Sequence, residues 1–353
     1  MLTVGIIGAG SISDLHLRHY KDNPDCVVKS IADCNIELAK AKAEKYGIKT
    51  FCSDYHEILS DSEIDAVCIL TPTFTHKDIV LEAISNKKHI FCEKPPALNA
   101  DEVRLCVEAA KNYDKCLMYG FVCRFKPQTQ YMKSYIDSGK MGKIFCAEAA
   151  RLNHLSKSHG WFASKKLGGG ALKDGAIHEL DQILYLMNYP KPKTVLATSS
   201  THNKDLPYKI ESADSKWKSA NATAYERDIE DFIKGLITFE DGSSIIIKAS
   251  DILNTLETGT SVEINGEKAG FKFLPFASRE SLKIIEISDD YCVKQLTPTF
   301  DSQNVFQTEV NHFVNCCLGK EECIIKPQEA VTLMEIIDAI YKSAETGKAV
   351  NFN

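Results

Sequence analysis

Asp174 and His178 lie one helical turn apart in the segment that follows three consecutive glycines. Asp181 and Tyr185 continue the spacing, which predicts a titratable row on one face of a helix that begins near Leu172. A carboxylate one turn from an imidazole can orient the ring and raise its basicity, as a general base for a hydroxyl proton requires. An ordinary solvated pair of charged side chains has the same pattern.

The composition is typical of a globular enzyme with two domains. The chain has 353 residues, which is too long for one small core. Its net charge of -6 and the lack of a basic block argue against nucleic acid or an anionic membrane surface as the main partner. No apolar run approaches the length of a membrane span, and residues 1–8 read as a strand rather than a signal peptide, so we expect a cytoplasmic protein.

Cysteine and histidine spacing predicts no metal site. The 13 cysteines are scattered without CxxC spacing, and many lie in apolar runs, as small core residues of a reducing cytosol do. His178-Glu179 is half of an H-E-x-x-H zinc motif, but Gln182 stands where the second histidine would be. His312 is expected to pack as an ordinary helix residue.

Strands and helices alternate up to residue 122, which predicts an α/β domain with a parallel sheet over residues 1–122. Strands then dominate residues 123–353, and the turn signals Glu240-Asp241-Gly242 and Asn265-Gly266 predict antiparallel hairpins. The second domain is therefore expected to be an α+β unit whose open, largely antiparallel sheet carries the Asp174 helix. Residues 203–224 are polar enough for a long loop, and Glu230-Asp231 is expected to begin a strand at the surface.

A dinucleotide-binding turn is predicted near the N-terminus. Gly8 and Gly10 stand between a strand and a helix, where backbone amides and a helix N-terminus can hold a pyrophosphate. Ser13 replaces the third glycine of the usual pattern. Asp33 ends the next strand and can bind both ribose hydroxyls, and because a carboxylate repels a 2'-phosphate the pattern favours NAD over NADP.

Two further loops follow strands at the carboxyl edge of the predicted sheet. Thr71 and Pro72 lead to His76, which either caps the next helix or contacts the cofactor. Glu93 and Lys94 precede a proline, and the lysine held there can supply a fixed positive charge to a substrate hydroxyl or oxyanion.

Together these motifs resemble the family named for glucose-fructose oxidoreductase, inositol dehydrogenase and the rhizopine-catabolism protein MocA. The resemblance covers almost the whole chain and is carried by the segments Gly8-Ala9-Gly10-Ser11-Ile12, Thr71-Pro72 with His76, Glu93-Lys94-Pro95, Arg124-Phe125, Gly168-Gly169-Gly170 with Asp174 and His178, and Ser343 to Lys348. It implies an N-terminal Rossmann domain, a C-terminal sheet used in homodimers or homotetramers, and a pyridine-nucleotide reaction. The departures are Ser13 and Lys173, and Lys173 leaves the substrate open because it can approach the same pocket.

The resemblance implies Lys94, Asp174 and His178 as the catalytic group. The cofactor-binding residues that we expect are Gly8, Gly10, Ser11, Ile12, Asp33, Thr71, Pro72, His76, Glu93, Lys94 and Arg124. The substrate-binding residues that we expect are Lys94, Asn153, His154, Trp161 and His178, since an aromatic face beside hydrogen-bonding groups suits a sugar, although a loop histidine is as often solvated.

The function predicted is a hydride transfer between NAD(P) and a sugar, cyclic polyol or sugar derivative. One alternative is an NAD-dependent glycosidase that oxidises and re-reduces its sugar. A second is a nucleotide-sensing regulator of the same fold, and the intact Lys94, Asp174 and His178 argue against it because a sensor needs no positioned base.

Overall fold

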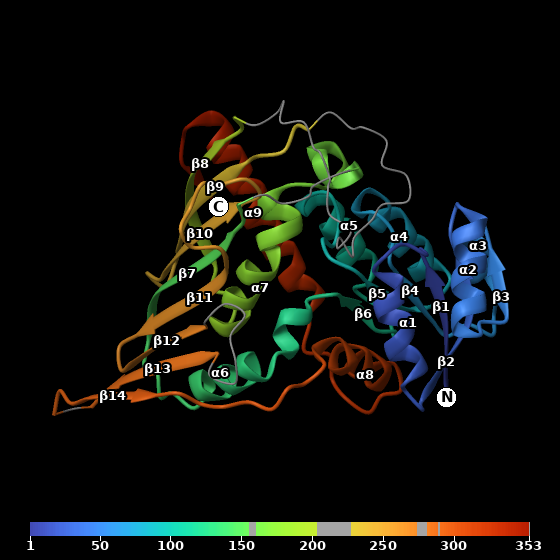
Figure 1. The fold of residues 1–353 in the computed structure, drawn as a ribbon, viewed down its shortest axis with the longest axis horizontal. Coiled ribbons are helices and arrows are strands. Elements are labelled where there is room, and N and C mark those ends of the chain that lie inside the picture. The colour runs from blue at the N-terminus through green and yellow to red at the C-terminus, as the bar shows by residue number, and fades with distance from the viewer. Residues whose placement is uncertain (155–159, 203–226, 274–280, 289, 353) are drawn as a thin grey trace.

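The computed structural model describes residues 1–154, 160–202, 227–273, 281–288 and 290–352, and their strands form two sheets (Figure 1). The predicted combination of a parallel α/β sheet with a largely antiparallel second sheet is confirmed. The loop expected over residues 203–224 lies outside the described ranges. None of the helices within them has the length and apolar character to cross a membrane.

The six-stranded sheet is parallel and has the order β3-β2-β1-β4-β5-β6. Its strands are β1 (Leu2–Ile7), β2 (Cys26–Ala32), β3 (Thr50–Cys52), β4 (Ala66–Ile69), β5 (His89–Cys92) and β6 (Leu117–Tyr119). Its helices are α1 (Ser13–Lys21), α2 (Ile36–Tyr46), α3 (His56–Ser60), η1 (Thr73–Thr75), α4 (His76–Ser85) and α5 (Ala100–Ala109). Strand β4 is buried along its whole length, because helices cover both faces of such a sheet.

The nine-stranded sheet has the order β14-β13-β12-β11-β7-β10-β9-β8-β15, and only the β7–β10 pair among these is parallel. Its strands are β7 (Ile144–Leu152), β8 (Pro192–Ser200), β9 (Phe232–Phe239), β10 (Ser244–Ser250), β11 (Gly259–Gly266), β12 (Ala269–Phe273), β13 (Leu282–Ile287), β14 (Val293–Leu296) and β15 (Val350–Asn351). Both hairpin signals join neighbouring antiparallel strands, β9 to β10 and β11 to β12. Burial alternates along β9, because one face of the sheet is covered and the other is open.

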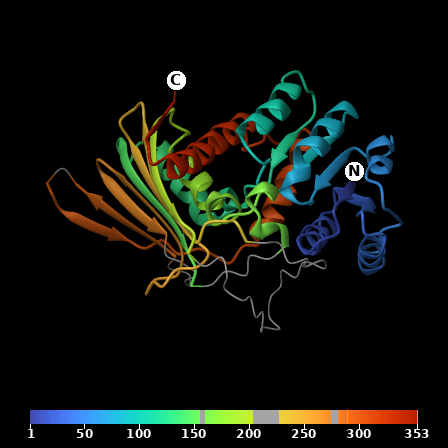
Figure 2. The same ribbon diagram turned by 90° about the horizontal axis from the view of Figure 1, so that it is seen from above.

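Helices from the C-terminal part lie between the two sheets, as Figure 2 shows. The short helices η2 (Val122–Phe125), η3 (Gly160–Ala163) and η4 (Lys165–Leu167) accompany α6 (Pro127–Asp137), α7 (Ile177–Leu186), α8 (Val305–Cys317) and α9 (Pro327–Thr346). Helix α9 packs on β8 and on α5, and α8 packs on α1. The chain therefore returns from the second sheet to cover helices of the first.

The segment after the glycines is wound differently from the regular helix predicted. Residues Ala171–Ala176 form a wide π-helical turn, η5, and the α-helix α7 starts only at Ile177. The extra width changes the angular spacing, so Asp174, His178 and Asp181 do not share one solvated face. Asp181 is fully buried, whereas Asp174 and His178 are half-buried.

The expectation that Glu230 and Asp231 lie at the surface is wrong. Glu230 is 1% exposed and Asp231 is 2% exposed. The Asp231 carboxylate pairs with the buried Arg227 at 2.5 Å, and a Glu230 carboxylate oxygen accepts the backbone N–H of Leu172 at 3.0 Å. Their contacts fix the start of the π-helical turn and the segment just before β9, and this requires both carboxylates to lie inside the protein.

Candidate active site

Gly8 makes the tight turn between β1 and α1. Its φ of 105° lies in the left-handed region that favours glycine, and its N–H donates to the Ala32 carbonyl at 2.8 Å. The next amide, of Ala9, donates to Asp33 Oδ2 at 2.8 Å, and Asp33 Oδ1 accepts the N–H of Asn35 at 2.9 Å. Asp33 is thus fixed at the end of β2, where the sequence predicts the ribose site.

Replacing Gly8 or Gly10 with alanine should separate folding from cofactor binding. A Cβ on Gly8 would lie 2.7 Å from the backbone oxygen of Leu70, whereas one on Gly10 would meet no described atom within 4 Å. We expect Gly8→Ala to lower the melting temperature of the cofactor-free protein, because the substituted residue also strains its positive φ. Gly10→Ala should keep that temperature and weaken NAD binding. Equal melting temperatures for both variants, measured by scanning calorimetry, would contradict this prediction.

Two residues of α1 stabilise the loops around the turn. Ser13 is fully buried and its hydroxyl donates to the Gly10 carbonyl at 2.7 Å, so a serine fits where the usual pattern has glycine. His16 Nε2 contacts Glu93 Oε1 at 2.7 Å, and Glu93 Oε2 accepts the N–H of Lys94 at 3.0 Å. Burial opposes ionisation, but the contacts with His16 and Lys94 outweigh it and lower the pKa of Glu93. Glu93 therefore positions the lysine loop on α1.

His76 links the same loop to the end of β4. Its side chain is buried, with Nδ1 2.8 Å from the Pro95 carbonyl and Nε2 2.8 Å from the Thr71 carbonyl. The Thr75 hydroxyl donates to the Thr71 hydroxyl at 2.7 Å, which closes the turn. Both ring nitrogens of His76 face carbonyl oxygens, so this histidine joins two loops.

Lys94 meets Asp174 across the two halves of the chain. Its ammonium donates to Asp174 Oδ1 at 2.9 Å and to the Asp174 carbonyl at 2.7 Å. Both side chains are mostly covered, at 18% and 27% exposed. The π-helical turn aims the carboxylate at the lysine, and among the described contacts Asp174 makes none with His178. Asp174 thus orients and balances Lys94 rather than the imidazole.

His178 follows one turn later with a half-buried ring whose Nδ1 is buried and has no partner among the described residues. Burial, followed by the positive charges of Lys94, Arg151 and Lys126, lowers the pKa of His178 well below its ordinary value. The ring is therefore neutral near pH 7. A neutral imidazole in a cationic surrounding can accept a proton from a bound hydroxyl group.

Each of the three glycines before the π-helical turn touches a different neighbour. A Cβ would lie 2.7 Å from the Thr73 side chain at Gly168, 2.1 Å from the Phe162 carbonyl oxygen at Gly169, and 2.7 Å from the Tyr341 hydroxyl at Gly170. Thr73 follows β4, so Gly168 lets the segment approach the parallel sheet closely. The triplet brings Asp174 within reach of Lys94.

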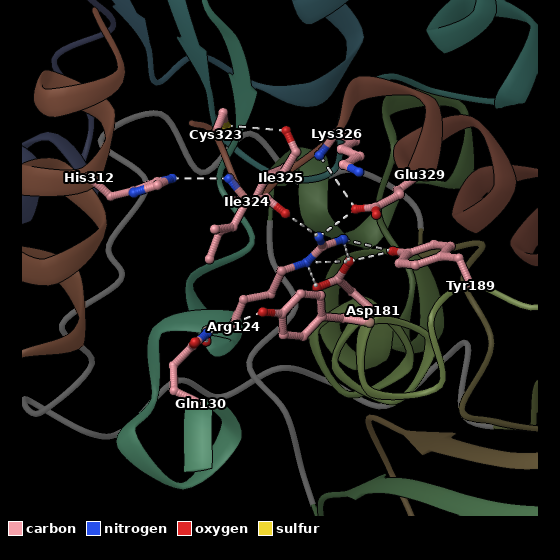
Figure 3. Close-up of polar contacts among 11 residues, drawn as sticks. Arg124, Gln130, Asp181, Tyr189, His312, Cys323, Ile324, Ile325, Lys326 and Glu329 are labelled. Carbon is pink, nitrogen blue, oxygen red and sulfur yellow. Dashed lines mark hydrogen bonds and ion pairs between the residues drawn. The ribbon is translucent and has the colours of Figure 1, made fainter. Parts of the chain in front are cut away.

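Arg124 was expected at the cofactor, and the structure places it in a buried network at the junction instead (Figure 3). Its Nε and Nη2 donate to the two carboxylate oxygens of Asp181 at 3.0 and 2.6 Å. Nη1 donates to Glu329 at 2.5 Å and to the Ile324 carbonyl at 3.2 Å, and Nη2 also donates to the Tyr189 hydroxyl at 2.9 Å. Every guanidinium nitrogen is engaged, so Arg124 joins η2, α7 and α9.

The remaining candidates have mixed placements. Lys173 donates to the Leu98 carbonyl at 2.7 Å and lies over the Tyr341 ring. The Asn153 amide donates to the Ser250 carbonyl at 3.1 Å. His154 is exposed, and Trp161 is half-buried against Phe162 with ring centroids 3.8 Å apart.

Sequence reasoning missed His16, Lys126 and Arg151. His16 had a usable signal, because it lies in the first turn of the helix that follows the glycines, close to the predicted cofactor loops. Lys126 follows the Arg124-Phe125 pair directly and Arg151 lies near the end of β7, yet only the fold brings their charges to His178.

The chain has the two parts of a nicotinamide-dependent oxidoreductase, a Rossmann-type unit and an α/β unit that presents polar groups to it. The profile described as "Oxidoreductase family, NAD-binding Rossmann fold" matches residues 2–121, and "Oxidoreductase family, C-terminal alpha/beta domain" matches residues 133–352. The protein belongs to this family, the one named for glucose-fructose oxidoreductase, inositol dehydrogenase and MocA, so the resemblance noted in the sequence is confirmed.

Individual relatives agree with this assignment. D-glucoside 3-dehydrogenase of Escherichia coli is 30% identical and is aligned over 99% of this chain and 97% of its own. Inositol 2-dehydrogenase of Rhizobium meliloti is 34% identical over 56% of this chain and 58% of its own. A structure of levoglucosan dehydrogenase in complex with NADH and levoglucosan has a TM-score of 0.85 at 24% identity and covers 99% of both chains, which establishes the shared fold.

Proposed function

We propose that this oxidoreductase is an NAD-dependent dehydrogenase or reductase of a sugar, cyclic polyol or sugar derivative. The observation that carries the proposal is the Lys94–Asp174 ion pair together with the neutral His178. Lys94 follows β5 at the same edge of the parallel sheet where Gly8 follows β1 and Asp33 follows β2. The names of the relatives, which are dehydrogenases of glucosides, inositol and levoglucosan, support the substrate class.

In the proposed reaction His178 takes the proton of a substrate hydroxyl, and Lys94 stabilises the negative charge that develops on that oxygen. Asp174 keeps the ammonium in place through its carboxylate and its carbonyl. The nicotinamide of bound NAD supplies the hydride acceptor for the alcohol carbon. In the reductive direction the same groups return the proton to the carbonyl oxygen.

The residues around the β1–α1 turn fit a dinucleotide. Gly10 has open space where a Cβ would be, so a pyrophosphate can approach the backbone. We assign Asp33 to the ribose hydroxyls, and its negative charge favours NAD over NADP. We further assign Ser11 and Ile12 to the pyrophosphate. Thr71 and Pro72 are assigned to the side of the loop after β4 that faces the cofactor. The rim of the substrate site is assigned to Asn153, His154 and Trp161.

Alcohol oxidation should lose its pH dependence above pH 6.5. The lowered pKa of His178 means that the ring is already deprotonated there, and activity should fall only as the pH drops through that lower value. The measurement is kcat/KM between about pH 5 and pH 8. Lys126→Met removes one of the positive charges that depress the pKa, so it should move the inflection to higher pH. An inflection above pH 6.5 in the unmodified enzyme would oppose the assignment.

We also propose that the chain divides into units 1–122 and 123–353, acts in the cytoplasm, and forms a homodimer or homotetramer. The open face of the nine-stranded sheet supports self-association, because it exposes apolar side chains on several strands. Those on β7, β8, β9 and β13 are Phe145, Leu196, Leu236 and Ile285. Light scattering of Leu196→Glu against the unmodified protein tests the assembly.

The experiment that tests the function is the absorbance of reduced nicotinamide over a panel of inositols, hexoses and glucosides, each offered with NAD and separately with NADP. We expect the absorbance of reduced nicotinamide to increase with NAD and one class of substrate. Silence across the panel while NAD binds tightly would overturn the proposal, and a stronger signal with NADP would overturn the role given to Asp33.

A further inference from the structure

A histidine and two cysteines gather at the end of α8, and the described contacts join none of them to Lys94, Asp174 or His178. His312 and Cys316 are four residues apart on the helix, and Cys323 lies in the segment that follows it. One ligand atom from each of the three lies within 4.8 Å of the others, and His312 Nε2 is 3.4 Å from Cys316 Sγ. Cysteine and histidine spacing predicted no metal site, because the positions of these residues match none of the usual zinc motifs.

A third thiol lies beside the cluster and comes from the other half of the chain. Cys116 lies just before β6, and its side chain interacts with those of Cys316, Cys317 and Cys323, but it is not one of the three residues whose ligand atoms all lie within 4.8 Å of one another. Its backbone N–H donates to His89 Nδ1 at 3.0 Å, which holds the residue against β5. The set is then one imidazole nitrogen and three sulfurs, all on side chains that are buried or half-buried.

A carboxylate orients the histidine so that Nε2 faces the thiols. Glu321 Oε2 lies 2.7 Å from His312 Nδ1, and Glu321 Oε1 accepts from the Asn315 amide at 2.7 Å. Histidines that bind metals commonly donate their second ring nitrogen to a carboxylate in this way, which fixes the ring and its tautomer. A histidine that only packs in the core does not require a carboxylate on one ring nitrogen and thiols near the other.

We propose that His312, Cys316, Cys323 and Cys116 bind a zinc ion. One imidazole and three thiolates form the closed tetrahedral donor set of structural zinc sites, and this set disfavours Mg²⁺ and Ca²⁺, which require oxygen ligands. Two existing contacts would be replaced. The Ile324 N–H lies 3.1 Å from His312 Nε2, and the Cys323 thiol donates to the Ile325 carbonyl at 3.3 Å. Zinc binding releases the thiol protons.

The position of the site defines its role. Residues 323–326 run from the cluster directly into the buried network of Arg124, whose Nη1 donates to the Ile324 carbonyl and to Glu329 (Figure 3). Zinc there would join α8, the entry to β6 and this network. The ion therefore stabilises the packing of the second unit on the nucleotide-binding unit and takes no part in hydride transfer.

The first test is the metal content of protein purified under reducing conditions without chelator. We expect about one zinc per chain by plasma mass spectrometry, as for a closed site of high affinity. Cys316→Ser and Cys323→Ser should each lose the zinc and melt at lower temperature. Cys292→Ser, which changes an exposed cysteine on the far hairpin, should keep both the zinc and the melting temperature.

A cobalt titration keeps the proposal testable if those variants fail to fold. Adding Co²⁺ to reduced, metal-stripped wild-type protein should produce the thiolate charge-transfer and visible bands of a tetrahedral sulfur-rich site, saturating at about one equivalent. Zinc-free protein that takes up neither zinc nor cobalt would overturn the proposal. A disulfide between two of these cysteines, found by peptide mass spectrometry in protein that binds no zinc after reduction, would overturn it as well.

Discussion

Replacing His178 with alanine should lower kcat by about 10² to 10⁴, the usual contribution of a positioned proton acceptor. The reason is that the ring is neutral near pH 7 and lies within the electrostatic influence of Lys94, so it can accept the proton of a hydroxyl group whose oxygen Lys94 stabilises. NAD binding should persist, because His178 belongs to α7 and not to the β1–α1 turn. Turnover by stopped-flow absorbance and NAD affinity by calorimetry are the two measurements.

The matched control is His56→Ala, which removes an exposed histidine from α3. It should leave both turnover and NAD affinity unchanged. If His178→Ala turned over at the rate of this control, another group would have to accept the proton, and the role given to His178 would be wrong.

Replacing Arg124 with methionine should cost about 3 to 5 kcal/mol of unfolding free energy, which is typical when one partner of a buried ion pair is removed. Asp181 is fully buried and would lose all three of its bonds to the guanidinium, so its charge would stay uncompensated away from water. Glu329 and Tyr189 would lose partners too. Urea unfolding followed by tryptophan fluorescence measures the change.

Arg104→Met provides the comparison for that variant. Arg104 pairs with Asp101 and Glu335, but it is 45% exposed, so water replaces the lost contacts. Its removal should cost about 1 kcal/mol or less. A loss of similar size in the two variants would mean that burial adds nothing to the contribution of the Arg124 network, which joins η2, α7 and α9.

The parts of the structure that follow local patterns were predictable from sequence. Gly8, the following helix and Asp33 form a contiguous strand–turn–helix–strand unit, so spacing alone placed the carboxylate at the end of β2. The alternating strand runs likewise predicted two sheets of different kinds. Both predictions depend on periodicity, which is the property that a single sequence displays best.

Side-chain partners that are distant in sequence were not predictable. Spacing paired Asp174 with His178, but the π-helical turn places the carboxylate on Lys94, 80 positions earlier in the chain. The sequence predicted Arg124 as a cofactor ligand, and it did not reveal the carboxylate partners of Arg124, which are Asp181 and Glu329. Cys116 and Cys316 stand 200 positions apart, so nothing in their spacing could reveal that the fold brings them together.

Helix α8 belongs to the second unit in sequence but packs on the nucleotide-binding unit, so residues 1–122 lack part of their own packing. Phe313 packs edge-on against Phe91 of β5 with centroids 5.6 Å apart, and the Gln307 side-chain carbonyl lies 2.9 Å from His19 Nδ1 on α1. A boundary drawn at residue 122 therefore separates the two units in sequence but not in space. The fragment that ends there would expose the apolar surface of β5 and α1, so recombining this unit with another substrate domain requires that α8 travels with it.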